Sequence, residues 1–80
     1  MDIRDVEILL NEIAEERGVP KNIKSMIVDS IGMLSREGEM IEKMAHITSI
    51  LDDASNDPNI SAHIRTKIWS TVSCLEEGMR

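Results

Sequence analysis

The sequence predicts an all-α fold, a four-helix antiparallel bundle built from two similar helical hairpins. Apolar residues recur at three- and four-residue steps in four segments of the 80-residue chain, and that spacing is typical of amphipathic helices. Clusters of turn-forming residues separate the segments. The two halves also resemble each other at an offset of 41 residues. We therefore expect a single helical domain over residues 1–80, with hairpin one over 2–37 and hairpin two over 39–80.

The first hairpin is expected to contain helices over about residues 2–17 and 20–37. The apolar stripe of its first helix consists of Ile3, Val6, Leu10 and Ile13. Gly18 predicts a left-handed cap after this helix, and Pro20 suits the first position of the next one. That second helix is expected to stop at Gly38, and its stripe consists of Ile23, Ile27, Ile31 and Leu34.

The second hairpin is expected to begin with a helix over about residues 39–56, whose stripe consists of Met40, Met44, Ile47, Leu51 and Ala54. The turn-forming run 56–59 follows, and Pro58 within it disfavours helix for the preceding residue. Ser61 is a good N-cap for the last helix. The stripe of that helix consists of Ile64, Ile68, Val72, Leu75 and Met79. No segment shows a competing strand pattern.

An internal repeat accounts for the likeness of the two halves. A shift of 41 residues lays Ile23 on Ile64 and Ile27 on Ile68, and it keeps size and charge at other positions although few residues are identical. We interpret this as a duplicated helical hairpin. Repeat solenoids need at least about three units to bury their faces, so two hairpins predict a closed bundle.

Charge alternates along the chain, which has a net charge of −6. The expected first and third helices are acidic, since the net charges of 1–18, 19–36, 37–57 and 58–80 are −4, +2, −5 and +1. This pattern predicts surface ion pairs within each hairpin: Glu12 or Glu16 with Lys24, and Asp53 or Asp57 with Arg65. Exposed pairs of this kind contribute only about 0 to 1 kcal/mol each, so they bias register more than they stabilise the fold.

Residues suited to catalysis or metal binding are few and scattered. The only histidines, His46 and His63, fall on different helices without other ligands at metal-binding spacing. We expect His46 to be solvated. Because no nucleophile stands beside His63, we interpret it, like Asn22 at the corresponding position, as a turn-stabilising residue, with a general base as the alternative. Cys74 is expected to make a small apolar contact, and a single cysteine excludes an internal disulfide.

A run of oxygen-bearing side chains resembles a calcium loop: Asp52, Asp53, Asp57 and Asn59. The match fails because Pro58 stands where the loop needs its glycine, and Ile64 stands where it needs a bidentate glutamate. We therefore predict no metal, no cofactor, no catalytic residue and no enzymatic activity.

Apolar residues outside the stripes predict an interaction surface. These residues are Val28, Trp69, Ile8 and Ile41. Boundary packing is the plainer interpretation, but Trp is a favoured interface anchor, so an unknown protein partner or a homodimer centred on Trp69 is the functional one. No segment is long and apolar enough to predict a membrane span. A cytoplasmic interaction or structural module is the leading hypothesis, with no small-molecule substrate evident.

A basic patch supports an alternative function, association with RNA or the ribosome. Its residues would be Lys21, Lys24, Arg65 and Lys67, if the two hairpins bring their turns together. The negative net charge opposes nucleic-acid binding, and Trp69 is the only aromatic residue that could stack on a base. Nucleic acid is therefore an unfavoured partner.

Two strings also carry a family resemblance. They are 19–24, Val-Pro-Lys-Asn-Ile-Lys, and 55–60, Ser-Asn-Asp-Pro-Asn-Ile, which continues through His63 and Trp69. The chain resembles the small archaeal proteins of uncharacterised protein family 0147 over nearly its whole length. It departs from them at Ser61, where a proline is expected, and at 16–18, where a more acidic turn is usual. The resemblance implies a compact, all-helical, cytoplasmic protein of archaeal type, and it supplies no activity.

Overall fold

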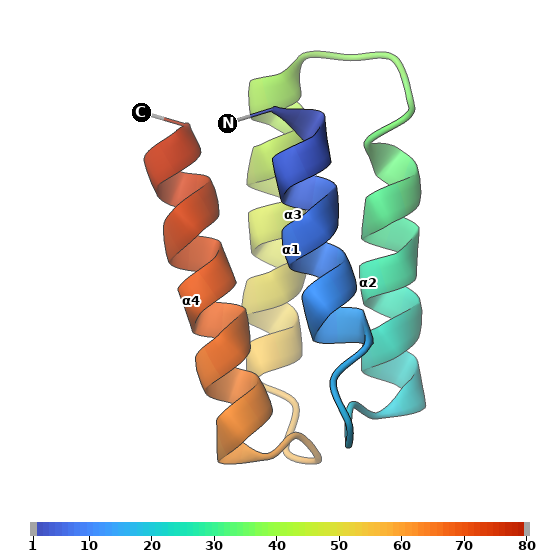
Figure 1. Ribbon diagram of the computed structural model, residues 1–80, viewed down its shortest axis with the longest axis vertical. Coiled ribbons are helices and arrows are strands. Elements are labelled where there is room, and N and C mark those ends of the chain that lie inside the picture. Colours follow the sequence, from blue (N-terminus) through green and yellow to red (C-terminus); the bar gives the residue numbers. More distant parts are fainter. Residues whose placement is uncertain (1, 80) are drawn as a thin grey trace.

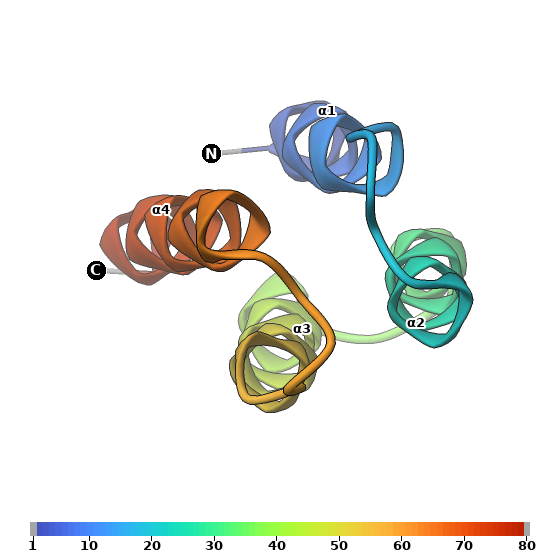
Figure 2. The same cartoon turned by 90° about the horizontal axis from the view of Figure 1, so that it is seen from below.

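Four α-helices, alternately up and down, make up the computed structural model, which describes residues 2–79 (Figure 1). They are α1 (Ile3–Ala14), α2 (Lys21–Met33), α3 (Met40–Ser55) and α4 (Ala62–Gly78). No strand occurs in this described part of the chain. Along the bundle axis the helices occupy four corners, with α1 beside α2 and α4, and with α2 and α4 diagonally opposed (Figure 2). The predicted all-α four-helix bundle is confirmed.

The core is aliphatic and draws on all four helices. Its fully buried side chains include Val6, Leu10, Ile13, Ile27, Ile47, Leu51, Ile64, Ile68 and Leu75. These residues belong to the predicted stripes, because one face of each amphipathic helix turns inward. The prediction was wrong for Ile3, whose side chain is 43% exposed. Ile3 begins α1 at the open end of the bundle, nearly one turn beyond Val6, the first buried residue.

Helix α1 begins as capping rules require and ends earlier than expected. The side chain of Asp2 accepts a hydrogen bond from the backbone N–H of Asp5 at 3.0 Å, and the side chain of Asp5 accepts one from the backbone N–H of Asp2 at 3.3 Å. The helix ends at Ala14 instead of residue 17. A tight turn follows, in which the N–H of Glu16 donates to the carbonyl of Ile13, three residues earlier, at 3.1 Å. Gly18 then adopts φ +92°, as the predicted left-handed cap requires.

Helix α2 also ends early, at Met33 instead of residue 37. A tight turn follows it, in which the N–H of Leu34 donates to Ile31 and that of Arg36 donates to Met33. The ammonium of Lys43, on α3, donates to the carbonyls of Leu34, at 3.3 Å, and Arg36. A cation from the next helix thus satisfies the carbonyls of the C-cap residue of α2, Leu34, and of the turn that follows it.

The connections within the two hairpins begin and end at corresponding positions of the sequence. Helices α1 and α3 end at Ala14 and Ser55, and α2 and α4 begin at Lys21 and Ala62, so both pairs are 41 residues apart. Ser61 caps α4 as predicted, since its Oγ accepts the N–H of Ile64 at 3.2 Å. These shared bounds fit the expected repeat, and the duplication itself stays a prediction.

Candidate functional site

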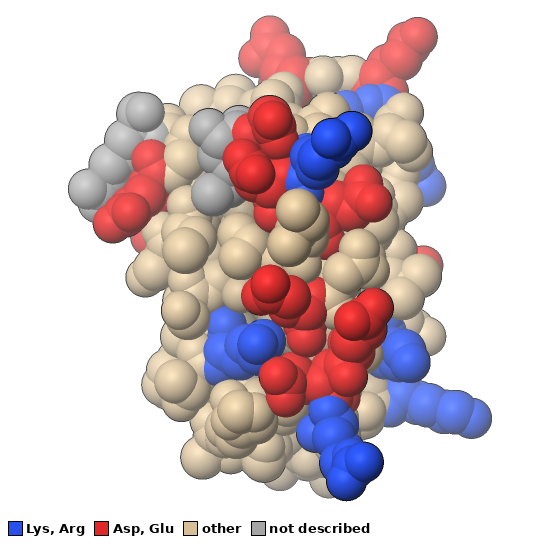
Figure 3. All heavy atoms as spheres, in the orientation of Figure 1, with Lys and Arg blue, Asp and Glu red and all other residues tan. Residues whose placement is uncertain are grey.

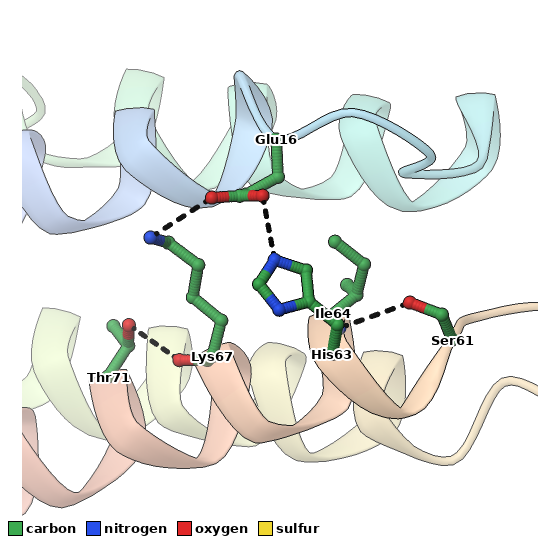
Figure 4. A network of polar contacts seen from close by, with 6 residues as sticks. All are labelled: Glu16, Ser61, His63, Ile64, Lys67 and Thr71. Carbon is green, nitrogen blue, oxygen red and sulfur yellow. Dashed lines mark hydrogen bonds and ion pairs between the residues drawn. The ribbon is translucent and has the colours of Figure 1, made fainter.

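The end of the bundle that holds the α1–α2 and α3–α4 connections carries its main polar network. Glu16, two residues beyond α1, faces α4 (Figure 4). Its Oε2 lies 3.0 Å from Nε2 of His63, and its Oε1 lies 3.2 Å from Nζ of Lys67. Thr71 and Ser61 support this part of α4, because each bonds to its backbone within one turn. The Glu16 carboxylate therefore joins the first hairpin to the second.

A second contact joins the hairpins at the same end. Nδ2 of Asn22, on α2, donates to Oδ2 of Asp57 at 3.0 Å. The other carboxylate oxygen of Asp57 accepts the N–H of Asn59 at 2.7 Å and so holds the α3–α4 turn. Asp57 stands 41 residues after Glu16, and His63 stands 41 after Asn22. The Glu16–His63 and Asp57–Asn22 contacts therefore involve corresponding positions of the two hairpins, with the carboxylate coming from the first hairpin in one contact and from the second in the other.

Both carboxylates are electrostatically stabilised in their charged form. Hydrogen bonds from His63 and then Lys67 lower the pKa of Glu16 below its usual value of 4.5. The pKa of Asp57 is lowered below 3.8, chiefly by the backbone N–H of Asn59 and then by the Asn22 amide. The sites are open to solvent, since the His63 side chain is 71% exposed. In both places, the geometry of the carboxylate is that of a side chain that links one hairpin to the other.

The ion pairs expected within each hairpin have different partners in the structure. Glu16 contacts α4 instead of Lys24, and Asp57 contacts Asn22 instead of Arg65. Nε of Arg65 donates to the Ser55 carbonyl at 2.9 Å, so this side chain caps the end of α3. The reason is positional: both carboxylates follow a helix end, where the chain turns and points them across to the other hairpin.

The side chains considered for catalysis are not assembled into one site. His63 pairs with Glu16, whereas Asn22 pairs with Asp57, and no nucleophile contacts either pair. Cys74 is exposed and lines an open hollow between α1 and α4 together with Leu9, and its apolar contact stays a prediction. His46 is exposed, as expected. Within residues 2–79, no three His, Cys, Asp or Glu side chains are grouped so that they could hold a metal ion.

The four cations of the predicted basic patch are divided between opposite corners of the bundle. Lys21 and Lys24 lie on α2, where they line an open hollow with Val28. Arg65 and Lys67 lie on α4, and both are engaged, with the Ser55 carbonyl and the Glu16 carboxylate. Acidic side chains dominate the face over α1 between these two groups (Figure 3). The turns meet at one end, but the cations form two separate pairs.

The predicted interface residues are all exposed. The exposed fractions of Ile8, Val28, Ile41 and Trp69 are 51%, 51%, 54% and 54%. Each lies on a different helix. Their exposure is as an interaction surface requires, and their role as an interface stays a prediction.

Comparison with known proteins identifies the family. The model of an uncharacterised protein family, UPF0147, matches residues 1–77. The chain belongs to UPF0147. A UPF0147 protein of Thermoplasma acidophilum is 40% identical over 73 residues, which cover 90% of this chain and 83% of that protein. One from Methanocaldococcus jannaschii is 41% identical over 75 residues, covering 92% and 81%. The resemblance to family 0147 is therefore confirmed, with archaeal relatives.

Solved structures agree with the fold. The crystal structure of a UPF0147 protein from Thermoplasma acidophilum matches with a TM-score of 0.81 and 37% identity, over 96% of this chain and 91% of that one. A crystal structure of a protein of unknown function, MMP1188, also matches with a TM-score of 0.81 and 37% identity, over 92% and 85%. No activity is established for this family. None of the helices in the described range 2–79 combines the length and hydrophobicity that crossing a membrane demands.

Proposed function

We propose that this UPF0147 protein is a non-enzymatic interaction module of the archaeal cytoplasm, which binds another protein through Trp69. The observation that carries the proposal is that the only aromatic side chain of the sequence is 54% exposed on α4, although the core is otherwise closed. A large exposed indole is costly to leave in water and is among the side chains that contribute most when an interface covers them.

The polar groups support a module over an enzyme. Glu16 and Asp57 are held charged and are engaged in joining the hairpins, so neither is poised to exchange protons near neutral pH. His63, the natural general base, is 71% exposed and is oriented by Glu16 alone. A general base acts efficiently when it is positioned against a substrate in a site that excludes water.

The distribution of charge supports a protein partner over RNA. Glu16 partly neutralises Lys67, and Arg65 is turned inward to the end of α3. A backbone-tracking RNA site needs a continuous positive surface with aromatic platforms. Binding through such a surface would fall steeply between low and physiological salt, whereas binding centred on an indole would change little.

The test uses the tagged full chain and its variants with native archaeal lysate. Trp69→Ser removes the indole, and Ile3→Ser is the matched control because it removes another half-exposed apolar side chain, from α1, that is not among the predicted interface residues. A partner that is captured by the wild type is then purified and titrated. We expect at least about tenfold weaker binding for Trp69→Ser and unchanged binding for Ile3→Ser. Equal affinity of wild type and Trp69→Ser for every purified partner would overturn the proposal.

A further inference from the structure

We propose that the outer face of the second hairpin, where α3 and α4 lie side by side, binds a basic amphipathic helix of a partner protein (Figure 2). Trp69 holds one end of that helix, and an apolar hollow between α3 and α4 holds the other. The inference rests on the proposed function, which places binding at Trp69, and it adds the rest of the surface and the chemistry of the partner.

The hollow lies between the start of α3 and the end of α4. It is lined by Met40, Ile41, Met44, Gly78 and Met79. Its volume of about 160 Å³ is smaller than the roughly 300 Å³ at which pockets for drug-sized ligands begin. The side chain of Ile41 is 54% exposed, so the lining is open to a partner. A hollow of this size and character suits one aliphatic side chain of a protein.

On α4, Trp69 lies on the flank that borders α3. Nε of Arg65 donates to the carbonyl of Ser55, the last residue of α3, so Arg65 faces that helix. At 100° per residue, Trp69 and Glu76 both lie within about 40° of Arg65 around the helix axis. Both side chains are exposed, so they lie at the outer edge of the contact between the two helices.

On α3, a matching stripe borders α4. Ile41 lines the hollow with residues of α4, and Ala45 and Asp52 lie within about 40° of it around the axis. These side chains are also exposed. Asp52 is three residues before Ser55, whereas Trp69 is four residues after Arg65, so Asp52 and Trp69 lie at about the same height on the bundle.

The two apolar anchors are spaced like residues on one face of a helix. Trp69 and Met79, which lines the hollow, are ten residues apart on α4, or about 15 Å along its axis. A partner helix with apolar residues at i, i+4, i+7 and i+11 presents its first and last anchors about 16 Å apart. Ala45, between the anchors on α3, is small, so a helix can lie close to the surface.

The charges of α3 and α4 favour a cationic partner. The five acidic side chains of these helices are exposed and, within residues 2–79, form no ion pair: Glu42, Asp52, Asp53, Glu76 and Glu77. The Lys and Arg side chains of the same helices all bond to oxygen atoms of the chain itself: Lys43, Arg65 and Lys67. Asp52 is level with Trp69, and Glu76 is one turn from Met79. Lysines or arginines beside each anchor of the partner would therefore meet a free carboxylate, whereas RNA and anionic membranes would be repelled.

The probe is a synthetic peptide of about 18 residues, with leucine at i, i+4, i+7 and i+11 and lysines beside them. A control peptide keeps the leucines and carries glutamate in place of lysine. Fluorescence anisotropy of the labelled peptides, titrated with the full chain at about 0.05 M NaCl, measures affinity.

Variants of the chain test the hollow and the charges separately. Ile41→Ser removes an exposed part of the hollow, and Ile3→Ser on α1 is its control. The double variant Asp52→Lys, Glu76→Lys reverses the charges beside both anchors. Each lysine falls in the last turn of a helix, where it suits the helix dipole, so the fold is retained. The double variant Glu7→Lys, Glu15→Lys makes the same change of net charge on the first hairpin.

We expect saturable binding of the basic peptide below about 1 mM and no binding of the acidic one. Ile41→Ser and the reversal at Asp52 and Glu76 should each weaken binding at least about fivefold, while both controls bind as the wild type does. No saturable binding of the basic peptide, equal binding of the acidic peptide, or affinity that Ile41→Ser and the reversal leave unchanged would overturn the inference.

Sedimentation of the chain without peptide decides whether a second copy occupies the face. A mass of two copies that Ile41→Ser reduces to one would assign the face to self-association and overturn the inference. None of these failures removes the proposed function. That function fails separately, when a purified partner binds Trp69→Ser as tightly as it binds the wild type.

Discussion

Glu16 and His63 meet across the two hairpins, with Oε2 of the carboxylate 3.0 Å from Nε2 of the ring. Asp57 and Asn22 make the equivalent contact at 3.0 Å with the roles of the hairpins exchanged. Each connection thus supplies one carboxylate to the start of a helix in the other hairpin. These two contacts link the hairpins at the end of the bundle that holds both connections.

The Glu16 carboxylate should make folding stability depend on pH. Its pKa is lowered in the folded chain, so its contribution is present above the usual value of 4.5 and is lost as pH falls through the folded pKa. Glu16→Gln should therefore be less stable than the wild type at pH 7, with a difference that shrinks steadily below pH 4.5. Urea unfolding at a series of pH values measures this, and a difference that is constant from pH 7 to acid would contradict the assignment.

The Asn22 and Asp57 contact should respond to salt differently from the Glu16 and Lys67 contact. An amide donor carries no net charge, so coupling between Asn22 and Asp57 should persist at high salt, whereas an exposed ion pair is screened. Double-mutant cycles with alanine at each pair, in about 0.05 and 1 M NaCl, measure both couplings. Equal salt sensitivity of the two pairs would be the contrary result.

The sequence was sufficient for the helices and the core but not for the contacts between hairpins. The spacing of apolar residues predicts the burial of Leu10, Ile27 and Ile68, because such a spacing puts them on one face of a helix and that face packs inward. The partners of Glu16 depend on the relative height of α1 and α4, which no local pattern encodes. The early end of α2 was missed for a similar reason, because the turn that follows it is held by Lys43 from another helix, which binds the carbonyls of Leu34 and Arg36.

Two buried isoleucines test the predicted duplication. Ile27 and Ile68 are both fully buried and are related by the offset of 41. Replacement by alanine removes a large aliphatic side chain from a closed core and should cost about 2 to 5 kcal/mol. If the hairpins are equivalent, Ile27→Ala and Ile68→Ala should lower the free energy of unfolding by similar amounts. Denaturant titration measures both values, and costs that differ by more than about 2 kcal/mol would argue against equivalent packing.

Two glycines should respond to alanine with opposite signs. Gly32 lies within α2, and an added methyl group would meet no atom within 4 Å, so Gly32→Ala should stabilise the fold by about 0.5 to 1 kcal/mol. Gly18 has φ +92°, where a Cβ is strained, so Gly18→Ala should destabilise it by about 1 kcal/mol. Thermal unfolding of the two variants beside the wild type checks the signs, and a shift of both in one direction would be inconsistent with these backbone conformations.

Acrylamide quenching of Trp69 fluorescence tests the proposed function most directly, because this residue is the only tryptophan. In the dilute, isolated protein the half-exposed indole should be quenched readily. When a purified partner is added at saturation, the quenching constant should fall severalfold and the emission should shift to shorter wavelength, as the interface covers the ring. A partner without tryptophan, or with its own tryptophans replaced, keeps the signal specific. Unchanged quenching at full saturation would contradict the account.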